Sequence, residues 1–212
     1  PGLKSRSGIV LVANGPRIPD LIEQIPEIKT IYHDSECCLL GEINSVIGRV
    51  RQAKNAIYIG GGTGIADGLI LNNNIMDFNK KNDLKRSWEI FLSSNTTVES
   101  NLSPNGMLDK WNRSSSKTLK TLFELEKETK SKPIFEEASD SFSLLVRERI
   151  SFFNRHNTQI EKIVIGQRLG EFLELCQENI RLLFESKTNI PIEYSSDRRT
   201  ASLGAAWKKF CS

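Results

Sequence analysis

The residues best suited to chemistry lie in a glycine-dense segment, NAIYIGGGTGIADGLIL, at Asn55–Leu71. Glycine lacks the side chain that would keep backbone N–H groups away from a phosphate, and it tolerates the turns that aim them at one. Thr63 adds a hydroxyl donor within the run. The segment therefore predicts a phosphate cradle, although a β-hairpin whose loop simply requires glycine explains the same letters.

Short apolar segments flank the glycines and predict two neighbouring strands joined by this loop. Further strands are predicted at 9–12, 28–32, 162–166 and 190–194. Helices are predicted at 20–24, 39–50, 119–128, 139–154, 172–184 and 200–210. The polar segment 72–111 is expected to hold loops and short elements that line an opening. Strands that alternate with helices favour a layered α/β fold, and the sequence shows no internal repeat.

Composition and charge disfavour several classes of protein. The 212 residues, 38% of them hydrophobic, are enough for one or two cores. The net charge of +3 comes from bases scattered among acids, so no nucleic-acid partner is expected. No apolar run reaches the roughly twenty residues that span a bilayer, and no secretory signal opens the chain. We therefore expect a cytoplasmic protein without a membrane partner. The cysteines, Cys37, Cys38, Cys176 and Cys211, are expected to be free thiols, because they form neither a CxxC pair nor a regular framework.

Ordered matches on both sides of the glycine segment resemble one family. They are IKTIYHDSECCLLGE at Ile28–Glu42, KIVIGQRLGE at Lys162–Glu171, ASLGAAW at Ala201–Trp207, and the opening Pro1-Gly2 with SGIVLVAN. The chain is similar to the bacterial ROK group of sugar kinases, repressors and related open reading frames. In that family a strand ends in Asn-Asp, the next helix carries Ala-Leu-Gly-Glu, and a Gly-Thr-Gly-Ile-Gly-Gly-Gly loop follows.

The resemblance implies a two-lobed α/β fold of the actin-like, ribonuclease H-like ATPase type. Residues 1–54 would be the remainder of the N-terminal lobe, 55–197 the C-terminal nucleotide-binding lobe, and 198–212 a helix that packs back on the N-terminal lobe. The superfamily's first phosphate motif, an Asp-x-Gly-Gly-Thr hairpin, has no counterpart in this sequence. We therefore expect the N-terminal lobe to be incomplete and the chain to match only the later part of the family's length.

The family's catalytic base matches Asp34, which would take the proton from a sugar hydroxyl as it attacks the γ-phosphate. An Asp that starts a helix is equally explained as an N-cap. His33 stands where the family has a sugar-binding Asn, and Asn14 stands where a polar sugar contact is common, although an Asn before Gly15 also suits a turn. Glu89 matches the Glu of a sugar-binding Glu-x-Gly-His motif, or is a surface acid. The Gly and His of that motif are replaced by Phe91 and Leu92.

The nucleotide would be bound by the glycine loop and by one glycine after a later strand. The residues expected to bind it are Gly61, Gly62, Thr63, Gly64 and Gly166. Two replacements depart from the family, Ala66-Asp67 for a glycine pair and Gln167 for the glycine after Gly166, while Arg168 is either a purine or phosphate contact or a solvated side chain. ATP as co-substrate and Mg²⁺ are implied. No zinc and no protein metal ligand are expected, because residues 93–112 contain neither cysteine nor histidine.

The activity implied by the resemblance is ATP-dependent phosphorylation of a hexose or an N-acylhexosamine. The alternative is a catalytically degenerate protein of the same fold that binds a sugar, a nucleotide or a partner. Family repressors carry a DNA-binding segment that nothing in this sequence matches, and a homodimer is possible because relatives often dimerise. A dinucleotide-binding fold is disfavoured, because the glycine loop joins two strands and does not open a helix.

Overall fold

The computed structural model describes residues 2–4, 8–12, 17–78, 80 and 83–211. Its centre is a five-stranded mixed sheet in the order β5-β4-β3-β8-β9. The strands are β3 at Ala56–Gly61, β4 at Ile65–Leu71, β5 at Asn74–Ile75, β8 at Lys162–Gly166 and β9 at Ile192–Ser195. β3 pairs antiparallel with β4 and parallel with β8, which in turn pairs parallel with β9. The predicted α/β class is confirmed.

The predicted hairpin around the glycines is also confirmed. Every residue of β3 and β4 is buried, as expected for central strands covered on both faces. Gly61 pairs with Ile65, so the connecting turn is Gly62-Thr63-Gly64. The N–H of Gly62 donates to the carbonyl of Gly64 at 2.8 Å. These three residues, which we call the glycine turn, project beyond the paired strands.

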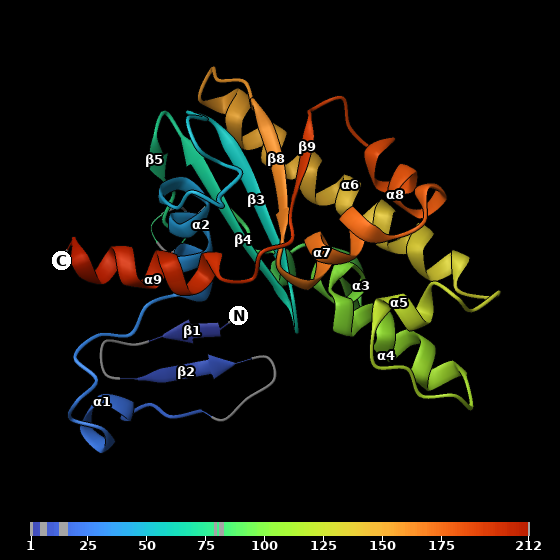
Figure 1. The fold of residues 1–212 in the computed structure, drawn as a ribbon, viewed down its shortest axis with the longest axis horizontal. Coiled ribbons are helices and arrows are strands. Elements are labelled where there is room, and N and C mark those ends of the chain that lie inside the picture. The colour runs from blue at the N-terminus through green and yellow to red at the C-terminus, as the bar shows by residue number, and fades with distance from the viewer. Residues whose placement is uncertain (1, 5–7, 13–16, 79, 81–82, 212) are drawn as a thin grey trace.

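Side chains alternate between two layers on the sheet. Ile57 and Ile59 pack into a large aromatic core with the long helix α6, Lys132–Arg155, whereas Tyr58 packs into a smaller cluster with Leu39 of α2, Asp34–Asn44. Figure 1 shows α2 and α9 on one side of the sheet and α6 on the other. This period of two follows from the pleat of a strand.

Helix α9, Thr200–Phe210, has the predicted bounds and packs closely across α2. A Cβ on Gly41 of α2 would lie 1.8 Å from the carbonyl oxygen of Thr200, and one on Gly204 of α9 would lie 1.8 Å from that of Cys37. Only glycine lets two helix backbones approach this closely. We call this contact the glycine crossing.

Near the N-terminus, β1 at Gly2–Lys4 and β2 at Ile9–Val12 form a separate antiparallel pair, followed by the short helix α1 at Leu21–Gln24 (Figure 1). The strand predicted at 9–12 is confirmed, and the strand predicted at 28–32 is wrong. Residues 28–33 form neither helix nor strand. None of the described strands pairs with them, and an apolar run without a partner cannot form a ladder.

The helix predicted by the apolar positions between Leu39 and Val50 ends earlier, at Asn44. Glu42 accounts for the end, because its carbonyl accepts the N–H of Val50 and its Oε2 accepts the N–H of Arg49 at 2.8 Å. Val46, placed on the buried face by the periodicity, is 86% exposed. The prediction was wrong here because a buried side chain turned the chain back on itself.

The segment 72–111 contains more structure than predicted. Its elements are the 3₁₀ helix η1 at Ser87–Glu89, the strands β6 at Phe91–Ser93 and β7 at Thr96–Thr97, and the helices α3 at Val98–Leu102 and α4 at Pro104–Ser114. Within this segment, Ser103 caps α4 by accepting the N–H of Gly106, and Pro104 occupies the first turn of the helix. Pro at that position favours a helix start.

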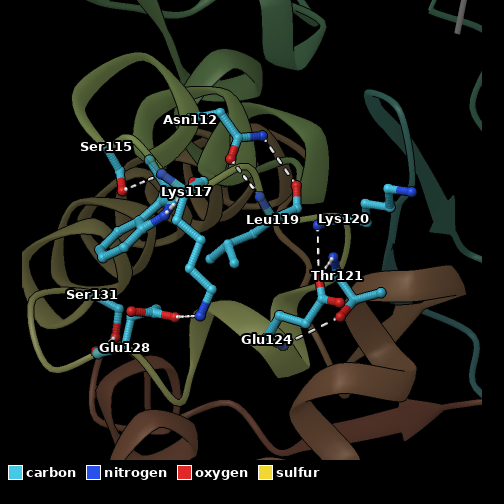
Figure 2. Close-up of polar contacts among 10 residues, drawn as sticks. Asn112, Ser115, Lys117, Leu119, Lys120, Thr121, Glu124, Glu128 and Ser131 are labelled. Atoms are coloured by element: carbon cyan, nitrogen blue, oxygen red, sulfur yellow. Dashed lines mark hydrogen bonds and ion pairs between the residues drawn. The ribbon is translucent and has the colours of Figure 1, made fainter.

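Only residues Leu122–Leu125 of the helix predicted at 119–128 are helical, as α5. Figure 2 shows why. Asn112 binds the backbone of Leu119 through both amide atoms, which holds that residue in the loop before the helix. Thr121 then accepts the N–H of Glu124, whose Oε2 accepts the N–H groups of Lys120 and Thr121, and Lys117 pairs with Glu128 beyond the helix.

The remaining helices differ from the predictions at their ends. α6 begins at Lys132, seven positions before the predicted Ser139. The single helix predicted over 172–184 is two, α7 at Gln167–Leu175 and α8 at Glu178–Glu185, because Gln177 donates its N–H to Glu126 Oε1 instead of continuing the helix. Among the described residues no helix is long and apolar enough to cross a membrane, and all four cysteines are free.

Candidate functional site

Asp34 is the first residue of α2, with His33 at the N-cap. The alternative that Asp34 is the N-cap residue is therefore wrong by one position, because His33 is the N-cap. The Oδ1 of Asp34 accepts the N–H of Ser35 at 2.9 Å, and the Asp34 side chain is exposed. Asp34 thus lies at the surface of a cavity.

A small cavity joins Asp34 to the strand that leaves the glycine turn. Its lining consists of His33, Asp34, Ser35, Ile65, Ala66, Asp67, Arg86 and Trp88. Ile65 is the first residue of β4, directly after Gly64. Two segments that the sequence separates by about thirty residues, the start of α2 and the end of the glycine turn, therefore meet at one site.

A larger cavity of about 330 Å³ adjoins the first and shares His33, Ser35, Asp67 and Arg86 with it. We call it the Arg86 cavity. Its other lining residues are Glu36, Leu39, Gly68, Ile75, Met76, Asp77, Phe78 and Lys208. This volume lies within the range of small-molecule sites.

A third cavity of about 300 Å³ opens on the other side of the glycine turn, and we call it the Thr63 cavity. Its lining is hydroxyl- and amide-rich: Thr63, Asn95, Thr96, Thr97, Glu99, Ser100, Asn101, Ser103, Asn105, Gly106, Asp109, Lys110 and Arg113. The expectation that segment 72–111 lines an opening is confirmed. A Cβ on Gly62 would meet nothing within 4 Å, so the turn presents open backbone beside this cavity.

The backbone of the glycine turn is available to a ligand. Among the described residues, the N–H groups of Thr63 and Gly64 donate no hydrogen bond. Lys110 and Arg113 supply positive charge to the same cavity, although Lys110 also pairs with Glu137. Backbone donors with nearby cations match the needs of a phosphate chain.

Glu99 is a functional candidate that the sequence reasoning missed. Its Oε2 accepts the N–H of Ile65 at 2.9 Å, which joins α3 to the end of the glycine turn. Burial raises the pKa of this carboxyl group. Among the described residues, Oε1 accepts no hydrogen bond, and Glu99 lines the Thr63 cavity. In the sequence, Thr97 before Val98-Glu99 indicates only the start of a helix and does not predict the contact of Glu99 with β4.

Asp67, which departs from the glycine pair of the resembled family, does not repel a phosphate here. Its side chain is 3% exposed and pairs with Arg149 of α6, which is 1% exposed. Asp67 alternates with Ala66 and Gly68, so it points toward the α6 layer and away from α2. The acid is therefore neutralised behind the strand.

Gly166 ends β8 beside Gly60 and is required for packing, since a Cβ there would lie 2.7 Å from the Tyr58 hydroxyl. Gln167 adopts a positive φ of 61°, a conformation that glycine adopts without strain. Its amide contacts Cys38 Sγ, and burial raises the pKa of that thiol to about 12. Arg168 donates to Asn105 at the start of α4, so it borders the Thr63 cavity and is not simply solvated.

Of the predicted sugar ligands, His33 lies at the cavities and Glu89 does not. His33 lines both cavities on the Asp34 side. Glu89 is exposed, lines neither of them, and accepts the N–H of Arg86 at 2.7 Å with Oε2. Asn14 lies outside the described residues.

Within the described ranges, no group of three His, Cys, Asp or Glu side chains is arranged to hold a metal ion. This finding concerns only a metal site whose ligands all come from the protein. Mg²⁺ in phosphoryl-transfer sites is held by one or two carboxylates and by the phosphates themselves, and Glu99 fits that lesser requirement.

No family model and no curated protein sequence matches the chain. Solved structures do match. A ROK hexokinase from Thermus thermophilus aligns with a TM-score of 0.73 at 14% identity, over 100% of this chain and 78% of that one. A ROK family glucokinase from Streptomyces griseus, in complex with glucose and AMPPNP, aligns with a TM-score of 0.69 at 13% identity, over 96% and 76%.

A ROK family transcriptional regulator, described as a homologue of the Escherichia coli MLC protein, also matches, with a TM-score of 0.69 at 14% identity over 99% of this chain and 60% of that one. Identities this low establish a common architecture only. The helices and sheet described above thus correspond over nearly the whole chain to kinases and to a regulator alike. This protein has the α/β fold of the ROK sugar kinases.

Proposed function

We propose that the protein is a ROK-type sugar kinase that transfers the γ-phosphoryl group of ATP to a sugar hydroxyl. The observation that carries the proposal is the shared cavity of Asp34 and the strand leaving the glycine turn. A base and a phosphate cradle on neighbouring segments are the parts that phosphoryl transfer needs. Glucose and AMPPNP in the Streptomyces griseus complex support this choice of ligands.

In this proposal ATP lies along the Thr63 cavity, with its phosphates on the amides of Thr63 and Gly64, while Gly62 leaves the approach to them open. Open space at Gly62 and the nearby cations Lys110 and Arg113 fit a phosphate chain. Mg²⁺, when bound, offsets the charge of the phosphates, with Glu99 as its carboxylate partner. Gly61 contributes by packing closely against Leu169 of α7, and Gly166 by packing closely against Tyr58 of β3.

The acceptor lies on the other side of Ile65. Asp34 takes the proton from its hydroxyl, and His33 holds a neighbouring hydroxyl. Glu89 acts through Arg86, whose backbone it fixes, and not as a direct sugar ligand. We also propose that the lobes divide near residues 54 and 197, so that the acceptor and the nucleotide approach from different lobes.

The test is a pair of measurements on wild type and Asp34→Asn. Phosphorylation of a panel of hexoses and N-acylhexosamines with Mg·ATP should fall about 10²- to 10⁴-fold in the variant. Calorimetric titration with Mg·ATP should be unchanged, because Asp34 does not line the Thr63 cavity. Equal turnover in the two proteins would refute the role of Asp34.

A second candidate function is binding without catalysis. It is favoured by Glu89, which bonds to its own turn instead of facing a cavity, and by the likeness to a transcriptional regulator. Saturable binding of a sugar with no transfer from ATP to any acceptor would support this candidate, and measurable turnover would exclude it.

A further inference from the structure

The Thr63 cavity is polar on every side. Apart from Gly106, each described residue that lines it carries a hydroxyl, an amide or a charged group in its side chain. A nucleotide base has two broad apolar faces, and sites for such rings are lined mainly by hydrophobic and aromatic side chains. A phosphate chain instead presents oxygen atoms that accept hydrogen bonds along its whole length. The lining therefore suits a phosphate chain better than it suits a base.

One wall of the cavity is a single face of α4. The lining positions on this helix recur at helical spacing: Asn105, Gly106, Asp109, Lys110 and Arg113. Lys110 pairs with Glu137, whereas Arg113 is exposed and forms neither an ion pair nor a hydrogen bond with any described residue. The donors of the Arg113 guanidinium are therefore available to an anion in the cavity.

The polar side chains near the glycine turn divide into two groups. Helix caps already use the hydroxyl groups of Ser100 and Ser103. The hydroxyl groups of Thr63 and Thr96 and the amide of Asn95 form no hydrogen bond within the part of the chain that the structure describes. These three side chains add donors to the N–H groups of the glycine turn.

Asn101 gives the most direct indication of a ligand. It lines the cavity, and its side chain is 95% buried, since its exposed fraction is 5%. Its Oδ1 has no hydrogen-bond partner, and its Nδ2 donates to no described residue. Buried amides in native proteins are nearly all paired, because an unpaired one is costly. A ligand whose oxygen accepts from Nδ2 would supply a partner that the described residues do not.

Two carboxylates, those of Glu99 and Asp109, line the same cavity. Mg²⁺ bound to phosphates takes one or two protein carboxylates as further ligands. The acids therefore suit an anion that enters together with Mg²⁺, while Arg113 and Asn101 contact the oxygen atoms of that anion.

We propose that the Thr63 cavity holds the phosphoryl donor through its phosphate chain and does not recognise its base. This inference rests on the proposed function, because it concerns the donor of that reaction. The donor class is then any molecule that ends in a triphosphate, whether it carries adenine, another base or no base at all. Inorganic triphosphate is the smallest member of this class.

Transfer from inorganic triphosphate balances in the same way as transfer from ATP. The bond between the terminal phosphorus and its bridging oxygen breaks, and the acceptor oxygen bonds to that phosphorus. Diphosphate leaves, and Asp34 takes the proton of the attacking hydroxyl. The base of a nucleotide takes no part in this exchange.

The experiment measures binding to the whole chain by calorimetry, without an acceptor. The probes are the Mg²⁺ complexes of ATP, GTP, CTP and inorganic triphosphate, together with adenosine. We expect the four triphosphates to bind with dissociation constants that agree within about fivefold, and adenosine not to bind measurably. Transfer from each triphosphate to a panel of hexoses and N-acylhexosamines is then measured separately.

Two variants test the residues that carry the inference. Arg113→Gln should weaken all four triphosphates by the same factor, at least about fivefold, because its charge acts on phosphates and not on bases. The matched control is Arg147→Gln, since Arg147 is an exposed arginine of α6 that lines none of the three cavities. It changes the net charge equally and should behave as wild type.

Asn101→Leu should also weaken all four triphosphates, yet leave the thermal unfolding temperature unchanged or higher, because it removes an unpaired buried amide. A purely structural role of Asn101 predicts the reverse, a lower unfolding temperature with unchanged binding, and this result would contradict the inference.

Three further results would each overturn the inference: binding of ATP at least tenfold tighter than that of the other triphosphates, binding of adenosine, or no binding of any triphosphate. Failure of the proposed function has a different signature, namely equal binding of the triphosphates with no transfer to any sugar. Transfer from ATP alone, with tighter binding of ATP, would leave the kinase function standing and remove this inference.

Discussion

Glycines in two regions of this molecule have opposite surroundings. At the glycine crossing, a Cβ on Gly41 or Gly204 would overlap the backbone of the facing helix at 1.8 Å. At the glycine turn, a Cβ on Gly62 would meet nothing within 4 Å. The first pair is needed for the fold, whereas the second position is needed only if something else approaches the backbone. Identical residues thus mark a packing contact in one region and an uncovered backbone turn in the other.

The regions also differ in how they are supported. The crossing is reinforced by buried Glu42, whose Oε1 accepts the hydroxyl hydrogen of Ser195 at the end of β9. The strand leaving the glycine turn is supported from behind by the ion pair of Asp67 with Arg149. One buried carboxylate therefore supports each region, and Gly62 of the glycine turn makes no close packing contact.

The largest effect is expected behind the turn. Arg149→Met leaves Asp67 buried without its partner and should reduce the free energy of unfolding by about 3 to 5 kcal/mol. Urea denaturation measures the loss. Arg198→Met, which breaks the exposed pair with Glu171, is the matched control and should cost less than about 1 kcal/mol. If the two variants lose the same amount, the buried pair does not support β4.

At the crossing, Gly204→Ala should cost about 3 kcal/mol, because the added methyl group must displace the backbone of α2 near Cys37. The matched control is Ala206→Ser on the exposed part of the same helix, which should change stability by less than about 0.5 kcal/mol. Stability unchanged in Gly204→Ala would show that the helices can separate without cost, and the comparison would fail.

Glu42 makes the crossing sensitive to pH. Burial raises the pKa of its carboxyl above the ordinary value of 4.5, so the folded protein holds this proton more tightly than the unfolded chain. The stability from this group is present below pH 4.5 and is lost as the pH rises through the folded pKa. Denaturation at a series of pH values should therefore show the stability of Glu42→Gln rising relative to wild type. A constant difference between the two proteins would contradict this sign.

The smallest effect on stability is expected at the turn. Gly62→Ala should change the free energy of unfolding by less than about 0.5 kcal/mol, because the new methyl group enters open space and no described glycine has a positive φ. Calorimetry should nevertheless show at least about tenfold weaker binding of Mg·ATP, since the methyl group holds phosphate away from the backbone. Unchanged binding would mean that the turn is only a hairpin loop.

Much of this comparison was accessible from the sequence, and some of it was not. The hairpin at Asn55–Leu71 and the helix at 200–210 were predicted because turn glycines and helical spacing are local signals. The strand predicted at 28–32 was wrong because an apolar run does not reveal whether a partner strand exists. The predicted helix end at Val50 was wrong because buried Glu42 accepts the N–H of Arg49, and this contact turns the chain after Asn44.

The candidate site divides in the same way. Asp34 and His33 were predicted as site residues from the family resemblance, and the glycine turn from its residue types. The structure brings Asp34 and His33 to one cavity with Ile65. Glu99 and Arg86 were not identified, since each matters through contacts with segments distant in the sequence or through stacking on rings. Glu89 was predicted as a sugar ligand or a surface acid; its side chain is exposed and accepts the N–H of Arg86.

The sequence by itself determined the alternation of strands and helices, the glycine turn and the acid at the start of α2, because these depend on backbone preferences over a few residues. Only the tertiary structure decided that Asp67 is neutralised by Arg149, that Gly41 and Gly204 serve packing while Gly62 faces open space, and that Arg86 lies beside Asp34. The physical reason is that burial, pairing and open space are properties of what surrounds a residue, and those surroundings come from parts of the chain that local patterns do not connect.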